Sequence, residues 1–150
     1  PGIPLALATG ARVLLVEPTG KKAAFLARAL RECGVEGEVV AERAEVAARE
    51  PRYREQFAFA TARAVASPPT VAELAVPFLR AGGRALLQRA VLEPRERQAL
   101  EDAAPMLGAR LVEEREVAGD RRIFILEKER PTDQRFPRRT GVPEKRPLCL

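Results

Sequence analysis

The 150-residue sequence contains no histidine, only two cysteines and no apolar run long enough to span a membrane. Without histidine, a Ser-His-Asp triad, a Cys-His pair and a His-ligated metal site are excluded within the chain. Cys33 and Cys149 are too few and too far apart to indicate a disulfide framework or a zinc site. A signal-peptide pattern is also absent. We therefore expect a cytoplasmic protein that binds neither a membrane nor a metal. Because the chain opens with Pro1-Gly2 and lacks a start Met, we expect its N-terminus to be cut.

The positive charge is concentrated near the C-terminus. The chain has a formal net charge of +5, and residues 128–150 carry seven basic and three acidic side chains. The body over 1–128 is thus nearly neutral, and 129–150 is predicted to be an extended basic arm outside the core. A cationic arm suits a polyanion such as RNA. On charge alone, a tail that only increases solubility is favoured.

Apolar periodicity predicts alternating strands and helices. Gly34 is expected to end a helix whose apolar face includes Phe25 and Cys33, so Cys33 is predicted to be a core residue. Gly82-Gly83 is expected to end a helix that begins at Pro68. Strands are predicted at 13–16, 38–41, 57–61 and 84–87, helices at 3–9, 21–33, 45–50, 68–81 and 94–107, and an antiparallel hairpin at 110–117 and 122–128. This alternation predicts an α/β fold with a mostly parallel sheet.

Charged residues follow several of the predicted strands, where ligands of such sheets bind. Glu17 could accept hydrogen bonds from ribose hydroxyls, although a solvated glutamate is the alternative when it is taken alone. An acid of that kind lies about 20 residues after a glycine-rich loop, which would precede Pro1. Arg63, among small residues, has a guanidinium that can hold phosphate or carboxylate. Arg89 would be its neighbour on the same rim.

Five segments in combination carry a resemblance to one family. They are Pro1–Leu5, Glu17–Lys22 with Phe25-Leu26, Arg43–Glu45, Ala62–Ala66 and Phe136–Leu148. Together they resemble the C-terminal part of the bacterial ribosomal RNA small subunit methyltransferase G family, also called the glucose-inhibited division protein B family. Ala62–Ala66 ("ARAVA") and the closing segment are specific in combination, and the others are weak singly.

The resemblance implies a Rossmann-like class I S-adenosylmethionine-dependent methyltransferase. Membership would imply transfer of a methyl group to N7 of guanine 527 in the 530 loop of 16S rRNA, by a monomer acting on that RNA or on the small ribosomal subunit. It assigns cofactor binding to Gly2, Glu17, Ala44, Glu45 and Arg63, catalysis to Arg63 and Arg89, and RNA binding to Arg138, Arg139, Lys145 and Arg146.

The sequence also departs from the family pattern. The glycine-rich loop and the first strand are missing, so the strands at Val13 and Phe57 lose their shared neighbour, and we do not expect this chain alone to bind the cofactor normally. Gln88-Arg89-Ala90 stands where the family has Lys-Gly, and Arg121-Arg122 replaces Arg-His. An inactive RNA- or ribosome-binding paralogue with the same fold therefore stays open, and so does a methyltransferase acting on a small molecule.

Overall fold

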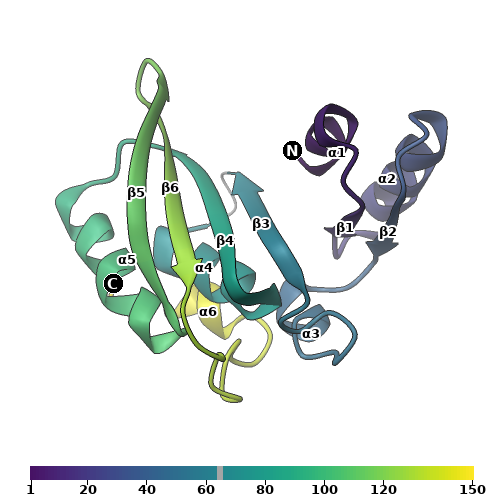
Figure 1. The fold of residues 1–150 in the computed structure, drawn as a ribbon. Helices are drawn as coiled ribbons and strands as arrows, with labels where there is room; N and C mark the ends of the chain where they lie inside the picture. Colours follow the sequence, from purple (N-terminus) through teal and green to yellow (C-terminus); the bar gives the residue numbers. More distant parts are fainter. Residues whose placement is uncertain (64–65) are drawn as a thin grey trace. The chain divides into compact units, whose positions relative to one another are not determined.

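The computed structural model describes residues 1–63 and 66–150, which form two compact units, Pro1–Ala47 and Ala48–Leu150 (Figure 1). The predicted elements are present in the predicted order. Among the described residues, no helix is both long and apolar enough to cross a membrane. This division differs from the expected body over 1–128 and arm over 129–150, because the C-terminal residues fold with the second unit.

The first unit is built around two parallel strands. Val13 lies opposite Gly37, and Val16 lies opposite Val40. Gly34 follows the second helix in the left-handed conformation, with φ of 63°, which glycine adopts without strain. The elements are α1 (Gly2–Thr9), β1 (Val13–Val16), α2 (Gly20–Glu32), β2 (Gly37–Val40) and α3 (Ala44–Ala47).

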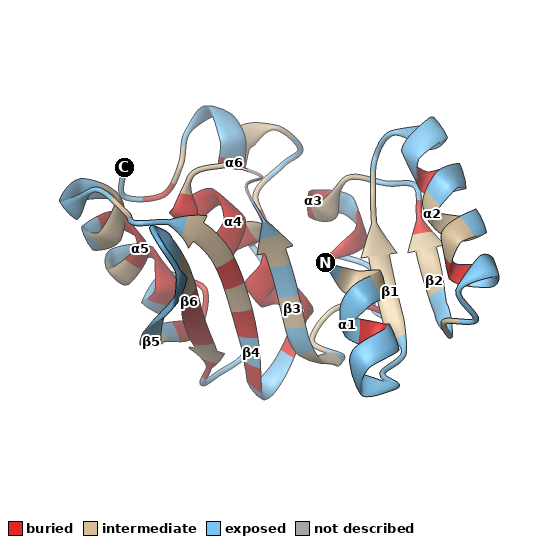
Figure 2. Ribbon diagram, turned by 90° about the horizontal axis from the view of Figure 1, so that it is seen from above, coloured by how far each residue is buried: buried red, intermediate tan, exposed pale blue. Residues whose placement is uncertain are grey.

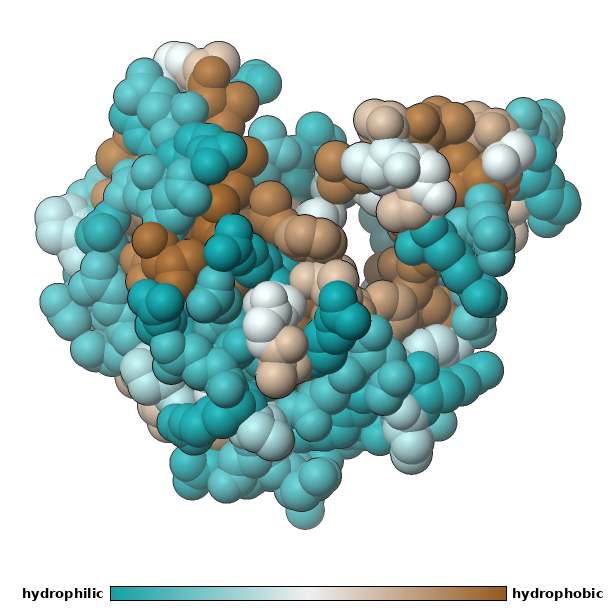
Figure 3. Space-filling model, viewed as in Figure 1, coloured by the Kyte–Doolittle hydropathy of each residue, from teal (hydrophilic) through white to brown (hydrophobic). Residues whose placement is uncertain are grey.

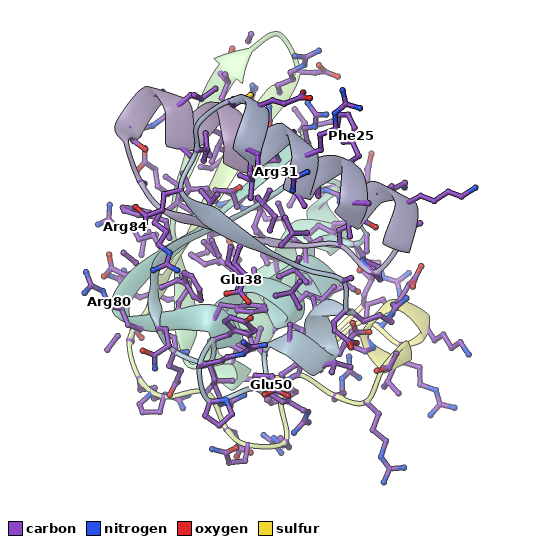
Figure 4. All side chains as sticks on the ribbon, turned by 90° about the vertical axis from the view of Figure 1, so that its right-hand side faces the viewer. Phe25, Arg31, Glu38, Glu50, Arg80 and Arg84 are labelled. Carbon is purple, nitrogen blue, oxygen red and sulfur yellow. The ribbon has the colours of Figure 1, made fainter. Side chains whose placement is uncertain are left out.

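The apolar face predicted for α2 is only partly covered. Ala23 and Leu30 are buried, but Phe25 is 68% exposed and Cys33 is exposed as well (Figure 4). The expectation that Cys33 is a core residue is therefore wrong. The physical reason is that α2 packs against a sheet of only two strands, which covers a narrow stripe of the helix.

The second unit contains a four-stranded sheet in the order β3-β4-β6-β5. Strands β3 and β4 are parallel, whereas β6 is antiparallel to both of its neighbours, β4 and β5. The predicted hairpin is confirmed, with Gly119 in its turn at φ 58°. The elements are β3 (Phe57–Arg63), α4 (Pro68–Ala75), the 3-10 turn η1 (Val76–Phe78), β4 (Leu79–Ala90), α5 (Pro94–Met106), β5 (Ala109–Ala118), β6 (Arg121–Lys128) and α6 (Val142–Lys145).

The strands at Val13 and Phe57, which were predicted to lose the strand between them, belong to two sheets. The strand at Val13 belongs to the two-stranded sheet of the first unit, and the strand at Phe57 to the four-stranded sheet of the second. Within its own sheet, β3 pairs only with β4, and β1 pairs only with β2. The α/β class with parallel strands and a C-terminal antiparallel hairpin is confirmed.

One face of the four-stranded sheet carries the core of the second unit. Alternate side chains of β4 and β6 pack against α4 and α5, as the red bands along these elements show (Figure 2). The opposite face holds Phe59, Thr61 and Arg63 of β3, which are exposed. Figure 3 shows apolar surface over this sheet between hydrophilic side chains. Since side chains alternate along a strand, the pleat places Arg63 on the face away from α4.

The helix predicted from Pro68 ends earlier than expected. It stops at Ala75, and β4 begins at Leu79. Pro77 explains the stop, since it has no N–H to donate and its ring clashes with the preceding turn. Gly82-Gly83 lies inside β4, where the pairing with β3 shifts register between Phe57 and Phe59.

Gly83 provides a test of this irregularity. A Cβ on Gly83 would lie 2.9 Å from the carbonyl oxygens of Phe57 and Arg80. Gly83→Ala should therefore lower the free energy of unfolding by about 1–3 kcal/mol, measured by urea denaturation. Ala81→Ser, at an exposed neighbouring position, should change it by less than about 0.5 kcal/mol. Equal stability of the two variants would contradict the close approach.

Candidate functional site at the carboxyl ends of the strands

In the first unit, three predicted cofactor residues lie at one edge of the β1-β2 sheet. Glu17 directly follows β1, and Ala44 and Glu45 follow the end of β2, which is parallel to it. The Glu17 backbone N–H donates to the carbonyl of Val40 at 3.0 Å. Its Oε1 accepts a hydrogen bond from the Thr19 backbone N–H at 2.9 Å. The fold thus holds the Glu17 carboxyl group at the carboxyl end of β1.

The other residues at this edge are packed closely. Glu45 is 3% exposed and forms an ion pair with Arg43, whose Nη2 lies 3.3 Å from Glu45 Oε1. Gly2, also predicted at the cofactor, lies against β1: a Cβ on Gly2 would meet Leu15 Cδ2 at 2.5 Å. The glycine thus permits close contact between α1 and β1.

In the second unit, Arg63 and Arg89 lie at the ends of neighbouring parallel strands. Arg63 is opposite Gln88, so Arg89 is one residue further and points to the other face of the sheet. Arg63 is exposed, whereas Arg89 is half-buried and its guanidinium donates to the carbonyl of Ala66. The two arginines therefore share an edge but not a face. Ala64 and Val65 of the "ARAVA" segment lie outside the described residues.

The C-terminal segment packs on the second unit, which differs from the predicted extended arm outside the core. Phe136 and Leu148 are 2% and 8% exposed and belong to the core. Thr70 Oγ1, in the first turn of α4, donates to the carbonyl of Pro143 at 2.8 Å. This contact holds α6 beside the start of α4, the helix that follows β3 (Figure 2).

Arginines of the second unit hold the backbone of the segment in place of a regular hydrogen-bond ladder. The Arg49 guanidinium donates to the carbonyls of Gln134, Arg135 and Pro137. The Arg54 guanidinium donates to the carbonyls of Thr132 and Phe136, each at 2.9 Å. Sequence analysis missed both arginines, because their partners are about 80 residues away in the chain.

Lys128 anchors the start of the segment inside the protein. It is 1% exposed, and its Nζ lies 3.0 Å from Glu55 Oε1 and donates to Thr132 Oγ1 at 2.7 Å. The same ammonium group donates to the carbonyls of Val76 and Leu79. Burial lowers the pKa of Lys128, and the hydrogen bond and charge of Glu55 offset only part of this effect. Burial raises the pKa of Glu55, but the Thr132 N–H and Lys128 outweigh it and leave that pKa below its usual value.

The four predicted RNA-binding residues divide into two groups. Arg138 forms an ion pair with the fully buried Glu73 of α4, with its Nη2 2.6 Å from Glu73 Oε2. Arg139, Lys145 and Arg146 are exposed and form no ion pair with any described residue. We call residues 139–146, which contain these three cations, the cationic turn. The role of Glu73 was not predicted from the sequence, although an acidic residue in an otherwise apolar helix indicates a buried ion pair.

Solved structures with a similar arrangement of strands and helices define the class of the fold. TYW2 of M. jannaschii in complex with AdoMet aligns with a TM-score of 0.63 and 14% identity, over 84% of this chain and 63% of that one. The T. thermophilus 16S rRNA N2 G1207 methyltransferase, in complex with AdoMet and guanosine, aligns with a TM-score of 0.56 and 23% identity, over 86% and 32% of the two chains. The chain has the fold of the class I S-adenosylmethionine-dependent methyltransferases.

Sequence similarity then identifies the family. The model of the rRNA small subunit methyltransferase G family matches residues 1–124, and the chain belongs to this family. The protein of that name from Rubrobacter xylanophilus is 48% identical over 99% of this chain and 60% of its own length. The one from Deinococcus deserti is 39% identical over 99% of this chain and 64% of its own length. The chain thus spans less than two thirds of the length of these curated relatives.

The Glu55–Lys128 pair predicts a dependence of stability on pH. Glu55→Gln leaves the buried Lys128 without its carboxylate and should lower the free energy of unfolding by about 3–5 kcal/mol at pH 7. Because the pKa of Glu55 is lowered in the folded state, its contribution is present above the usual value of 4.5 and is lost as the pH falls through the folded pKa. Urea denaturation of both proteins between pH 7 and about pH 3 should show the difference shrinking. A difference that stays constant over this range would contradict the pair.

Proposed function

We propose that this chain forms part of an S-adenosylmethionine-dependent enzyme that methylates N7 of guanine 527 in the 530 loop of 16S rRNA. The observation that carries the proposal is the cationic turn packed against the start of α4, the helix that follows β3, in a member of the rRNA small subunit methyltransferase G family. The substrate would be 16S rRNA or the small ribosomal subunit, and the protein a cytoplasmic monomer without a metal.

The residues at the carboxyl edge of β1 and β2 fit the nucleoside part of the cofactor. A carboxylate can accept hydrogen bonds from both ribose hydroxyls, and Glu17 is held at the end of β1 with only its Oε1 engaged by Thr19. Ala44 and Glu45 would border the adenine after β2, where the small side chain of Ala44 leaves space for a flat ring. Gly2 would let the start of α1 approach the cofactor closely.

The reaction needs little acid–base chemistry from the protein. When bound, S-adenosylmethionine would supply the methyl group that guanine N7 accepts, with the electron pair of the broken carbon–sulfur bond left on sulfur. The N7 lone pair is available without removal of a proton, so the absence of histidine is compatible with the proposal. The contribution of the protein would be alignment of the guanine and electrostatic stabilisation.

The positive charge that guanine gains limits where an arginine side chain can lie during the reaction. N7 methylation leaves a positive charge on the base, so a guanidinium next to N7 would oppose the reaction. Arg63, exposed at the end of β3, would instead hold an RNA phosphate or the cofactor carboxylate bidentately. Arg89 would stabilise the rim through its hydrogen bond to the carbonyl of Ala66.

RNA would be attracted mainly by the cationic turn. Arg139, Lys145 and Arg146 are exposed and have no acidic partner among the described residues. Charges of this kind bind phosphates and release counterions from the RNA. The family resemblance assigns RNA binding to Arg138 as well, but we do not count Arg138 among the phosphate-binding residues, because its guanidinium is paired with the Glu73 carboxylate.

A substitution at Arg63 tests the catalytic part of the proposal. In the gene product that contains this chain, Arg63→Gln should lower kcat/KM for methylation of small ribosomal subunits by about 100-fold, since it removes a positioned charge. The product is measured as N7-methylguanine by borohydride–aniline cleavage of the RNA. Arg95→Gln, the same change of charge at an exposed site on α5, is the control. If the unmodified protein binds the subunit but forms no N7-methylguanine, the inactive RNA-binding paralogue is the better account.

A second substitution tests the cationic turn. Arg139→Gln should reduce the slope of log Kd against log salt concentration by about 0.7–0.9, the effect of one lost phosphate contact. The measurement is fluorescence anisotropy of a labelled 530-loop hairpin bound to this chain at several KCl concentrations. An unchanged slope would contradict a phosphate contact at Arg139, and Arg95→Gln again serves as the control.

A further inference from the structure

The carboxylate of Glu73 is fully buried, and among the described residues Arg138 supplies its hydrogen bonds and its ion pair. The Arg138 backbone N–H donates to Oε1 at 2.7 Å, its Nε lies 2.9 Å from Oε1 and 3.1 Å from Oε2, and its Nη2 donates to Oε2 at 2.6 Å. A buried charge without a partner is costly, so the fold of the second unit requires Arg138 in this position.

Arg138 also closes the cationic turn. The same Nη2 donates to the carbonyl of Arg146 at 2.8 Å, eight residues further along the chain. One guanidinium therefore links α4 to both ends of the segment that carries Arg139, Lys145 and Arg146. Between these ends, Thr70 holds the carbonyl of Pro143. The segment itself is short of regular structure, with four residues in α6.

We propose that Glu73 and Arg138 form a latch that fixes the cationic turn against α4, and that Arg138 is a positioning residue and does not contact RNA. The RNA part of this inference rests on the proposed function. Three cations held at fixed positions lose less conformational freedom on binding phosphates than three cations on a loose tail. The latch thereby strengthens RNA binding through the geometry of the turn.

The latch and a direct RNA contact predict opposite effects when Glu73 is neutralised. Without the Glu73 carboxylate, a contacting Arg138 would be released toward RNA, and the protein would also gain one positive charge. Both changes favour binding to a polyanion. In the latch, the same substitution loosens the cationic turn, and RNA binding weakens although the net charge rises.

The experiment compares Glu73→Gln with Asp102→Asn in this chain. Both substitutions raise the net charge by one, and Asp102 is exposed on α5, where its Oδ1 accepts a hydrogen bond from Gln98 that an asparagine oxygen can keep. Dissociation constants are measured by fluorescence anisotropy with a labelled 530-loop hairpin at one KCl concentration. The latch predicts about tenfold weaker binding for Glu73→Gln and unchanged or tighter binding for Asp102→Asn. Binding by Glu73→Gln as tight as that of the unmodified chain would overturn the proposal.

A second variant tests the latch even if Glu73→Gln does not fold. Arg138→Lys keeps the charge but loses the fork that spans both carboxylate oxygens and the Arg146 carbonyl. Amide hydrogen exchange should then become at least tenfold faster at Lys145 and Arg146, with protection of β4 and β6 unchanged. Unchanged exchange at these amides would overturn the latch. If the unmodified chain does not bind the hairpin, the proposed RNA interaction fails, while the exchange measurement still decides whether the latch exists.

Discussion

A charge that is taken out of water needs a partner, and two such charges organise the second unit. Glu73 on α4 and Lys128 at the end of β6 are both buried in the middle of the fold. Leaving either unpaired would cost about 3–5 kcal/mol, a large share of the stability of a small domain. Their partners come from outside the regular elements: Arg138 from the C-terminal segment, and Glu55 with Thr132 from two loops. The C-terminal segment is therefore built into the fold.

This requirement changes what the basic C-terminus means for function. Lys128 and Arg138 are used inside the protein, and Arg130 donates to the carbonyl of Pro105. Fewer positive charges are thus available to a polyanion than the seven basic side chains counted over 128–150, but those that are available lie in one short segment. This segment is the cationic turn, which packs against the start of α4, the helix that follows β3. In the proposed function, the ion pairs that stabilise the unit also hold the RNA-contacting residues at the rim.

The sequence predicted most of the elements because their signals are local. Apolar runs gave the strands, and Gly119-Asp120 marked the hairpin turn. Predictions failed where distant partners decide the outcome. Cys33 is exposed because the sheet beside α2 has only two strands. The segment after Lys128 packs on the second unit because Arg49, Arg54 and Glu73, which lie 65 to 88 residues away in the chain, bind it. Gly82-Gly83 was predicted to end the helix that begins at Pro68, but that helix stops before Pro77. The two glycines lie inside β4 instead, where the pairing with β3 shifts register.

The proposed function places RNA at Arg63, at the end of β3, and along the cationic turn, which the body of the second unit holds in place. It is tested most directly by adding a 530-loop hairpin to the ¹⁵N-labelled chain and following the amide resonances. The account predicts that the largest shifts occur at Arg63 and across 139–146, with small shifts along α5 and in the β5–β6 turn. Shifts concentrated on α5 or the β5–β6 turn, with residues 139–146 unaffected, would contradict it.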